Sequence, residues 1–122
     1  MKFTLDARSG VNLIRAYSAS ELRIGETIVL RSCIVTADTL ITEWQPAAPA
    51  EMTARDLEAL LALRPQIVLW GASRSEQAPS LSVRAALAAQ AIGLEAMDLG
   101  AACRTFNILV QEERRVAAAL FL

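Results

Sequence analysis

The first 44 residues alternate between short runs of apolar and β-branched residues and short polar turns, which is typical of β-strands. Runs at 22–24 and 27–30 flank a Gly-Glu pair, and this spacing predicts a β-hairpin. Two further runs, at 33–35 and 40–42, continue the same pattern. The sequence therefore predicts an antiparallel β-meander over residues 1–44.

Beyond the meander, the spacing of apolar positions changes to that of helices alternating with strands. Residues 45–52 form a proline-punctuated connector that is too brief to separate domains. Over residues 53–122 the apolar positions recur every three or four residues between short continuous runs. Thr53 has the character of an N-cap, so the first helix is expected to begin there and to stop at Pro65.

The apolar run at 67–70, which ends at Gly71, has the pattern of a strand covered on both faces. A helix over about 82–91, closed by Gly93, then leads to a strand at 94–97. The two strands are expected to pair in parallel through a right-handed crossover.

A third helix over about 101–113 and a last strand at 116–121 complete the alternation. The fold class predicted is α/β. We expect residues 1–122 to form a single three-layer domain, with a mixed central β-sheet, an antiparallel N-terminal meander and helices packed on the sheet.

Composition excludes several kinds of chemistry. The 122 residues include no histidine, which removes Ser-His-Asp triads and His-containing zinc sites. Cys33 and Cys103 are too far apart in sequence for a CxxC pair, so no metal and no cofactor is expected. Twelve Lys and Arg residues against thirteen Asp and Glu residues argue against a nucleic-acid binder.

The chain shows no segment that would direct it into or across a membrane. The longest uncharged stretch, residues 85–94, is about half the length of a spanning helix. The N-terminus lacks the apolar core of a signal peptide, and the two cysteines have no pairing signature. A reducing cytoplasm is therefore the expected location.

A candidate ligand crevice follows the buried strand at 67–70. Gly71 would permit close backbone approach, Ser73 and Ser75 offer hydroxyls, and Arg74 could meet an anion. Asp98 follows the neighbouring strand and could join Arg74 as an acid/base or ligand-binding pair. The alternative is an ordinary glycine turn with a solvated loop, in which Asp98 bridges into the loop before the third helix.

Cys103 is expected near the start of the third helix, beside Arg104. A thiol in a first helical turn can have a lowered pKa, but no histidine base or resolving cysteine accompanies it. Burial in the core is the favoured interpretation for both cysteines. Trp44 and Trp70 are likewise expected to pack in the core, since no basic stripe accompanies them.

The C-terminal third resembles a family of small α/β domains, mostly of unknown function, that includes the mitochondrial NADH dehydrogenase (complex I) assembly factor 3 proteins. The residues that carry the resemblance are Met97, Asp98, Ala102, Cys103, Arg104, Thr105, Asn107, Glu112 and Arg115. The resemblance extends over nearly the whole chain. It implies a three-layer domain without known catalytic residues and a role in assembling a membrane complex through protein contacts.

Two positions depart from the family pattern. Ser73 stands where the family usually has a second glycine, and a positive φ there would disfavour serine. Glu113 stands where the family often has glycine, which argues against a tight turn at that point.

Two functions follow as hypotheses. The first is a non-enzymatic interaction or assembly protein with an unidentified protein partner, at the periphery of a membrane complex or as a homo-oligomer. The second is a small-molecule or anion-binding module, or an uncharacterised enzyme, that uses Gly71–Ser75 and Asp98.

Overall fold

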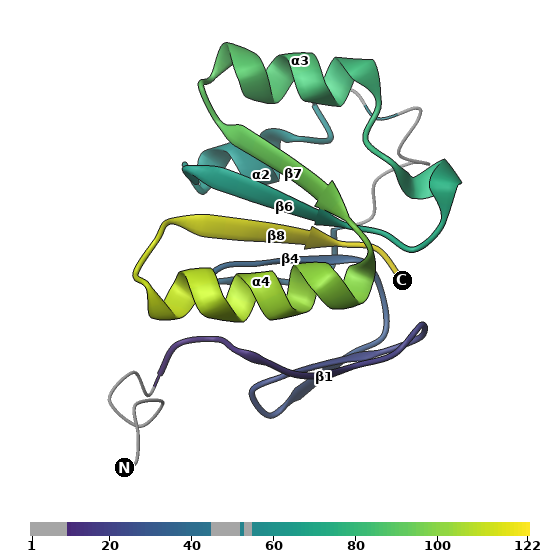
Figure 1. The fold of residues 1–122 in the computed structure, drawn as a ribbon, viewed down its shortest axis with the longest axis vertical. Coiled ribbons are helices and arrows are strands. Elements are labelled where there is room, and N and C mark those ends of the chain that lie inside the picture. Colours follow the sequence, from purple (N-terminus) through teal and green to yellow (C-terminus); the bar gives the residue numbers. More distant parts are fainter. Residues whose placement is uncertain (1–9, 45–51, 53–54) are drawn as a thin grey trace.

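The structure is a computed structural model that describes residues 10–44, 52 and 55–122. Its strands and helices are shown in Figure 1. In chain order they are β1 (Ile14–Tyr17), β2 (Leu22–Ile24), β3 (Thr27–Val29), β4 (Cys33–Val35), β5 (Leu40–Ile41), α2 (Glu58–Ala62), β6 (Ile67–Gly71), η2 (Ser75–Gln77), α3 (Leu81–Ala89), β7 (Gly93–Met97), α4 (Leu99–Gln111) and β8 (Val116–Leu120).

The larger of the two sheets is mixed and has the strand order β5-β4-β8-β6-β7. β6 pairs in parallel with β7 on one side and with β8 on the other, whereas β4 runs antiparallel to β8 and to β5. The C-terminal strand β8 therefore lies at the centre of the sheet, and all its residues are buried. The parallel pair predicted from the apolar runs at 67–70 and 94–97 is confirmed.

The smaller sheet contains β1, β2 and β3 in sequential antiparallel order. The hairpin predicted around the Gly-Glu pair is confirmed, and Gly25 has a φ of 59° in its turn. The meander does not continue as one sheet, however, because β4 and β5 belong to the larger sheet. β4 pairs there with β8, a partner from the far end of the chain that local sequence spacing cannot reveal.

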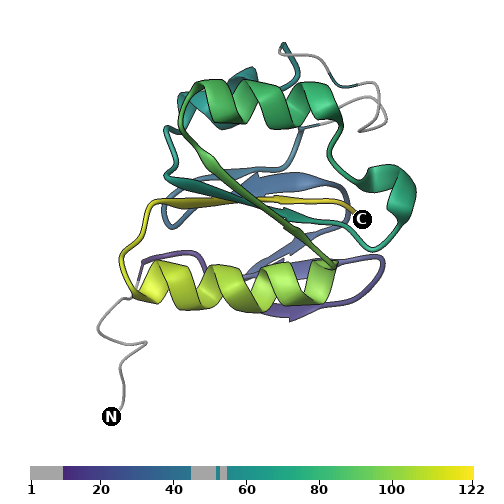
Figure 2. The same ribbon diagram turned by 45° about the horizontal axis from the view of Figure 1, so that its top comes forward.

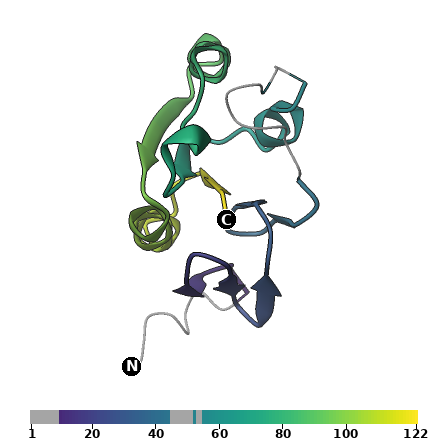
Figure 3. The same ribbon diagram turned by 90° about the vertical axis from the view of Figure 1, so that its right-hand side faces the viewer.

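Two hydrophobic cores lie on opposite faces of the larger sheet. One core packs α4 and the smaller sheet against the face that includes Leu69, and the other packs α2 and α3 against the face that includes Val68 and Trp70. Figures 2 and 3 show this layering from two further directions. The predicted α/β class, mixed central sheet and covering helices are confirmed, because β6 alternates its side chains between two apolar layers.

Helix α3 has a side-chain cap at its start and a residue with positive φ just after its end. The Ser80 side chain accepts a hydrogen bond from the Val83 amide at 3.2 Å and caps the first turn. At the other end Ala91 takes a φ of 58°, and the amides of Ala91 and Ile92 bond back into the last turn. The prediction that Gly93 closes this helix is wrong, because Gly93 is already the first residue of β7.

Helix α2 is shorter than the sequence pattern predicts. Its expected cap, Thr53, lies outside the described residues, and the helix follows Leu57 without a side-chain cap. Leu57 and Leu60 are fully buried against the sheet, so packing rather than capping stabilises this helix. Arg64, with a φ of 53°, separates the helix from Pro65.

Candidate functional site

The predicted crevice at the carboxyl ends of β6 and β7 is only partly assembled. Ser73, Arg74 and Ser75 line a shallow depression of about 270 Å³ together with Met97. Gly71 and Asp98, the other two residues predicted there, are not among its lining residues. That these five residues hold a ligand stays a prediction.

Gly71 has a packing role in the structure. It is buried, and a Cβ atom at this position would lie 2.7 Å from the Ala102 Cβ and 2.9 Å from the Leu120 Cδ2. The absence of a side chain therefore allows α4 to approach the sheet closely. Ala102, one of the residues that carry the family resemblance, is the small partner in this contact.

Two interactions hold the loop after Gly71. The Arg74 guanidinium lies 3.4 Å from the Glu76 carboxylate, and about two thirds of each side chain is exposed. The Trp70 indole donates a hydrogen bond of 2.7 Å to the Gln77 carbonyl and anchors the loop to the core. Ser73 does not have a positive φ, so serine fits this position without the strain that a glycine would relieve.

Asp98 is the N-cap of α4. Its carboxylate accepts a hydrogen bond of 2.8 Å from the Ala101 amide, and the φ and ψ angles of Asp98 are extended. The alternative in which Asp98 bridges into a loop before the helix is wrong, because no loop separates Asp98 from α4. The helix consequently begins at Leu99, two residues earlier than predicted.

Asn107, on α4, holds the smaller sheet in place. Its side-chain amide donates to the Ile14 carbonyl at 2.9 Å, and its side-chain oxygen accepts from the Ile14 amide at 2.8 Å. The side chain thus pairs with β1 as another strand would. Nearby on the same helix, the Thr105 hydroxyl lies 3.7 Å from the Met97 sulfur. These family-motif residues connect elements of the fold.

Arg104 joins α4 to β1 at the surface. Its guanidinium donates a hydrogen bond to the Tyr17 hydroxyl and lies 5.9 Å from the centre of the Tyr17 ring. Gly100 makes room for this contact, because a Cβ there would lie 2.8 Å from the Tyr17 Cε1.

Both cysteines are free and buried in the core between α4 and the smaller sheet. Burial raises the pKa of Cys33 to about 12 and the pKa of Cys103 to about 12; Arg104 lowers the latter only in part. Neither thiol is therefore an activated nucleophile at neutral pH. The favoured interpretation of both as core residues is confirmed.

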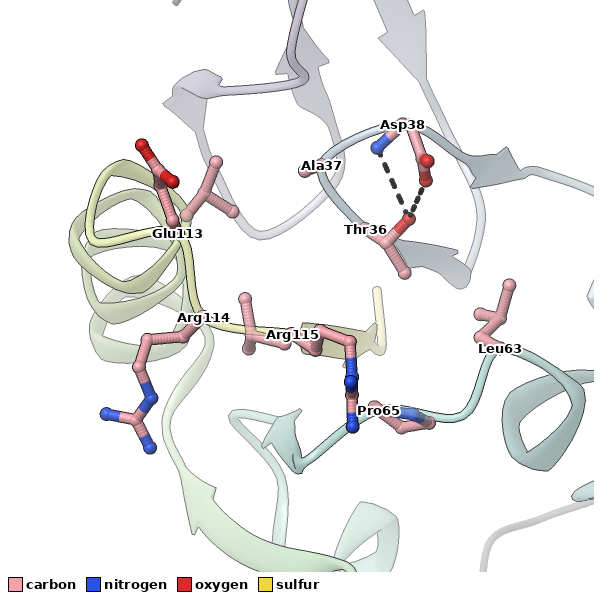
Figure 4. Close-up of a pocket in the computed structure, with 10 residues that line it drawn as sticks. Thr36, Ala37, Asp38, Leu63, Pro65, Glu113, Arg114 and Arg115 are labelled. Carbon is pink, nitrogen blue, oxygen red and sulfur yellow. Dashed lines mark hydrogen bonds between the residues drawn. The ribbon is translucent and has the colours of Figure 1, made fainter.

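Sequence reasoning missed a pocket at the opposite end of the parallel strands (Figure 4). This amino-end pocket has a volume of about 330 Å³ and lies where β6 and β8 begin. Its apolar lining consists of Ala37, Leu63, Pro65, Val110 and Val116. Its polar lining consists of Thr36, Asp38, Glu113, Arg114 and Arg115. Glu112, the C-cap residue of α4, and Arg115 belong to the family motif and to the charged run 112–115, which the sequence indicates only as a solvated helix end.

The end of α4 makes a tight turn beside this pocket. Glu113 has a φ of 61°, and the amides of Glu113 and Arg114 bond to the carbonyls of Val110 and Leu109. The expectation that Glu113 argues against a tight turn is therefore wrong. The turn forms because its hydrogen bonds and the buried start of β8 determine the backbone there.

The smaller sheet presents exposed apolar side chains along its edge strand. Ile28 is 50% exposed and Leu30 is 66% exposed. Both line an open groove of about 750 Å³ between β3 and the residues Thr42 and Glu43 that follow β5. Within the part of the chain that the structure describes, β3 has no strand partner on this side.

Residues 10–44, 52 and 55–122 contain no cluster of three or more Cys, Asp or Glu side chains arranged to hold a metal ion. Among the same residues, no helix is both long enough and apolar enough to span a membrane.

The mixed α/β domain with these motif residues belongs to a family described as a protein of unknown function (DUF498/DUF598), whose model matches residues 14–121. The chain is also 30% identical to the zebrafish (Danio rerio) protein named NADH dehydrogenase [ubiquinone] 1 alpha subcomplex assembly factor 3. That match covers 92% of this chain and 65% of the relative, so this chain spans slightly less than two thirds of the relative's length. The family resemblance carried by the C-terminal residues is confirmed.

Solved structures share the fold. A Xanthomonas campestris protein determined by NMR is 35% identical with a TM-score of 0.82, and the alignment covers 93% of this chain and 86% of that one. A Bordetella pertussis protein described as an Mth938-like domain is 25% identical with a TM-score of 0.73, and the alignment covers 99% and 92% of the two chains.

Proposed function

We propose that this protein acts without catalysis, as an assembly-factor-like interaction protein for a respiratory or other membrane complex. The observation that carries the proposal is its 30% identity over 115 residues to a named complex I assembly factor. The motif residues support it, because Asp98, Asn107 and Arg104 are engaged in holding the fold together. The raised pKa values of both cysteines support it too, because buried protonated thiols are poor nucleophiles.

We infer that the partner contacts edge strand β3. Its backbone groups can pair with an extended segment of another protein, and Ile28 in the strand and Leu30 just beyond its end supply apolar contacts. Arg31 and Glu43 give the groove both signs of charge, which suits a polypeptide better than a polyanion. The occupant that this surface fits is therefore an extended segment of a protein subunit.

Crosslinking in cells followed by mass spectrometry tests this proposal. We expect subunits of a respiratory or membrane complex among the crosslinked proteins. In the Ile28→Lys variant the yield of these crosslinks should fall roughly tenfold or more. Leu81→Lys is the matched control, because Leu81 is 84% exposed on α3, in the layer on the other face of the sheet. Equal crosslinking of both variants would remove β3 from the interface. Crosslinks to copies of this chain alone would contradict the assembly role.

The cytoplasm is the compartment that we propose. Both cysteines are free and buried, which suits a reducing environment. Fractionation of cells that produce the protein, before and after a high-salt wash of the membranes, would distinguish a free pool from peripheral attachment.

A second candidate function is the binding of a small anion at the carboxyl-end crevice. The depression lined by Ser73, Arg74 and Ser75 supports this alternative. A thermal-shift screen of small anions would test it: the shift produced by any ligand bound there should disappear in Arg74→Ala. A ligand that binds this variant equally well occupies another site.

A further inference from the structure

The ends of helices α2 and α4 border the amino-end pocket. The structure describes three non-glycine residues with positive φ, and two of them border this pocket: Glu113 lines it, and Arg64 stands between its lining residues Leu63 and Pro65. This conformation is sterically disfavoured for a residue with a side chain. The amides of Arg64 and Glu113 bond back to the carbonyls of Leu61 and Val110, so the ends of the two helices hold this rim of the pocket in place.

The walls of the pocket are preformed. Asn12 fixes the turn between β4 and β5: its backbone amide donates to the Ala37 carbonyl at 2.7 Å, and its side chain donates to the carbonyls of Thr36 and Thr39 at 2.9 and 3.2 Å. On the facing wall, the amides of Gln66 and Ile67 both bond to the Arg115 carbonyl. Because these walls are already ordered, binding a ligand would cost the protein little conformational entropy.

The charges around the pocket favour one kind of ligand. Asp38 and Glu113 balance Arg114 and Arg115, so the rim as a whole is neutral. The Asp38 carboxylate already accepts hydrogen bonds from the hydroxyls of Thr36 and Thr39 at 3.0 and 3.2 Å. Among the described residues no carboxylate lies within salt-bridge distance of the Arg115 guanidinium. In Figure 4 the Arg115 side chain extends toward Pro65.

We propose that the amino-end pocket binds a small monocarboxylate with an apolar body. The planar guanidinium of Arg115 matches the two oxygens of a carboxylate, and Leu63, Pro65 and Val116 provide apolar contacts for the body of the ligand. Asp38 disfavours phosphate and other multiply charged anions by repulsion. The volume of about 330 Å³ lies at the small end of the range for ligand pockets.

This proposal does not depend on the assembly role. The same chemistry could come from a free acid or from the carboxyl terminus of a chain that ends in an apolar residue. Both present a carboxylate next to a small branched group.

Titration of the full-length, isotope-labelled protein with 4-methylpentanoate, followed by amide NMR shifts, tests the proposal. We expect saturable shifts that centre on Thr36, Asp38 and residues 113–116. The neutral isostere 4-methylpentanamide and inorganic phosphate should each bind roughly tenfold or more weakly. The tripeptide Gly-Gly-Leu, compared with its C-terminal amide, distinguishes a chain terminus from a free acid as the source.

Variants localise the binding. Arg115→Gln should lower the affinity for 4-methylpentanoate roughly tenfold or more. Arg74→Gln, the matched change at the other end of the strands, should leave this affinity unchanged. If Arg115→Gln does not fold, Asp38→Asn serves instead and should tighten binding, because it removes a nearby negative charge. Equal binding of the acid and its amide, full binding by Arg115→Gln, or the absence of saturable shifts would each overturn the proposal.

Discussion

At the carboxyl ends of β6 and β7, Arg74 and Asp98 have partners in their own loop or helix, whereas at the amino ends of β6 and β8 Arg115 lines a pocket. Arg74 pairs with Glu76 and Asp98 caps α4. Arg115, at the other end, has no carboxylate partner among the described residues. Parallel strands usually present ligand sites at their carboxyl ends. Here α4 packs closely against Gly71 at that end, and the depression beside it, about 270 Å³, is smaller than the amino-end pocket of about 330 Å³.

Gly71 explains the close packing at the carboxyl ends. The missing side chain lets α4 lie close against β6 and β8 at their carboxyl ends. At the amino ends, the tight turn at Glu113 carries the chain from the end of α4 into β8, and the pocket lies beside that turn.

Among the variants that test this contrast, we expect Gly71→Ala to change stability the most. Its new Cβ would lie 2.7 Å from Ala102 and 2.9 Å from Leu120, so we expect a loss of about 1–3 kcal/mol in the free energy of unfolding. Urea denaturation measures the effect. Gly93→Ala is the matched control: its Cβ would make ordinary contacts of 3.6–3.9 Å, and we expect a change within about 0.5 kcal/mol. Equal effects at both glycines would contradict a packing role for Gly71.

The second test concerns the core between the two ends. Burial raises the pKa of the Cys103 thiol to about 12, so above about pH 9 the unfolded chain loses this proton while the folded chain keeps it. The contribution of the buried, protonated Cys103 thiol to the free energy of unfolding is therefore complete below about pH 9 and declines as the pH rises toward 12. We expect a slope of up to about 1.4 kcal/mol per pH unit for each thiol.

Urea unfolding between about pH 8 and about pH 10.5, under reducing conditions, measures this slope. Cys103→Ala should show a shallower decline than the natural sequence, whatever its stability at neutral pH. Identical slopes would show that the thiol is not shielded from water.

A third test asks whether Asp98 stabilises the protein by capping α4. Asp98→Ala should lower the free energy of unfolding by about 1 kcal/mol, because the Ala101 amide loses its acceptor. Asp98→Asn keeps an acceptor oxygen and should cost only a few tenths of that. If both variants lose the same stability, charge rather than capping explains the role of Asp98.

The smallest expected effect concerns backbone strain. Glu113→Gly at the pocket and Ala91→Gly at the end of α3 should each raise the free energy of unfolding by about 0.5–1 kcal/mol, because glycine adopts positive φ without a steric cost. Thermal or urea unfolding measures both. Ala88→Gly, inside α3, is the control and should destabilise by about 1 kcal/mol. A loss of stability at Glu113 would indicate that its side chain matters more than its backbone.

Local patterns predicted much of the fold. The hairpin around Gly25, the doubly covered strand β6 and the parallel pairing with β7 all follow from residue spacing and turn chemistry. Helix ends were less predictable: Ala91 and Glu113 take positive φ although neither is glycine. Hydrogen bonds and burial on both sides of each turn override the local preference, which a sequence pattern alone does not show.

The sequence by itself determined the fold class, the family and the absence of histidine-dependent chemistry, because these depend on residue types and on periodicity along the chain. Only the tertiary structure shows that β4 belongs to the larger sheet and that close packing requires glycine at position 71. It alone also shows which residue Asn107 hydrogen-bonds and where a pocket lies. Each of these depends on pairs such as Ile14 with Asn107 or Gly71 with Ala102, which are distant along the chain and meet only after folding. Spacing along a chain describes neighbours on one element, whereas sites are formed where elements meet.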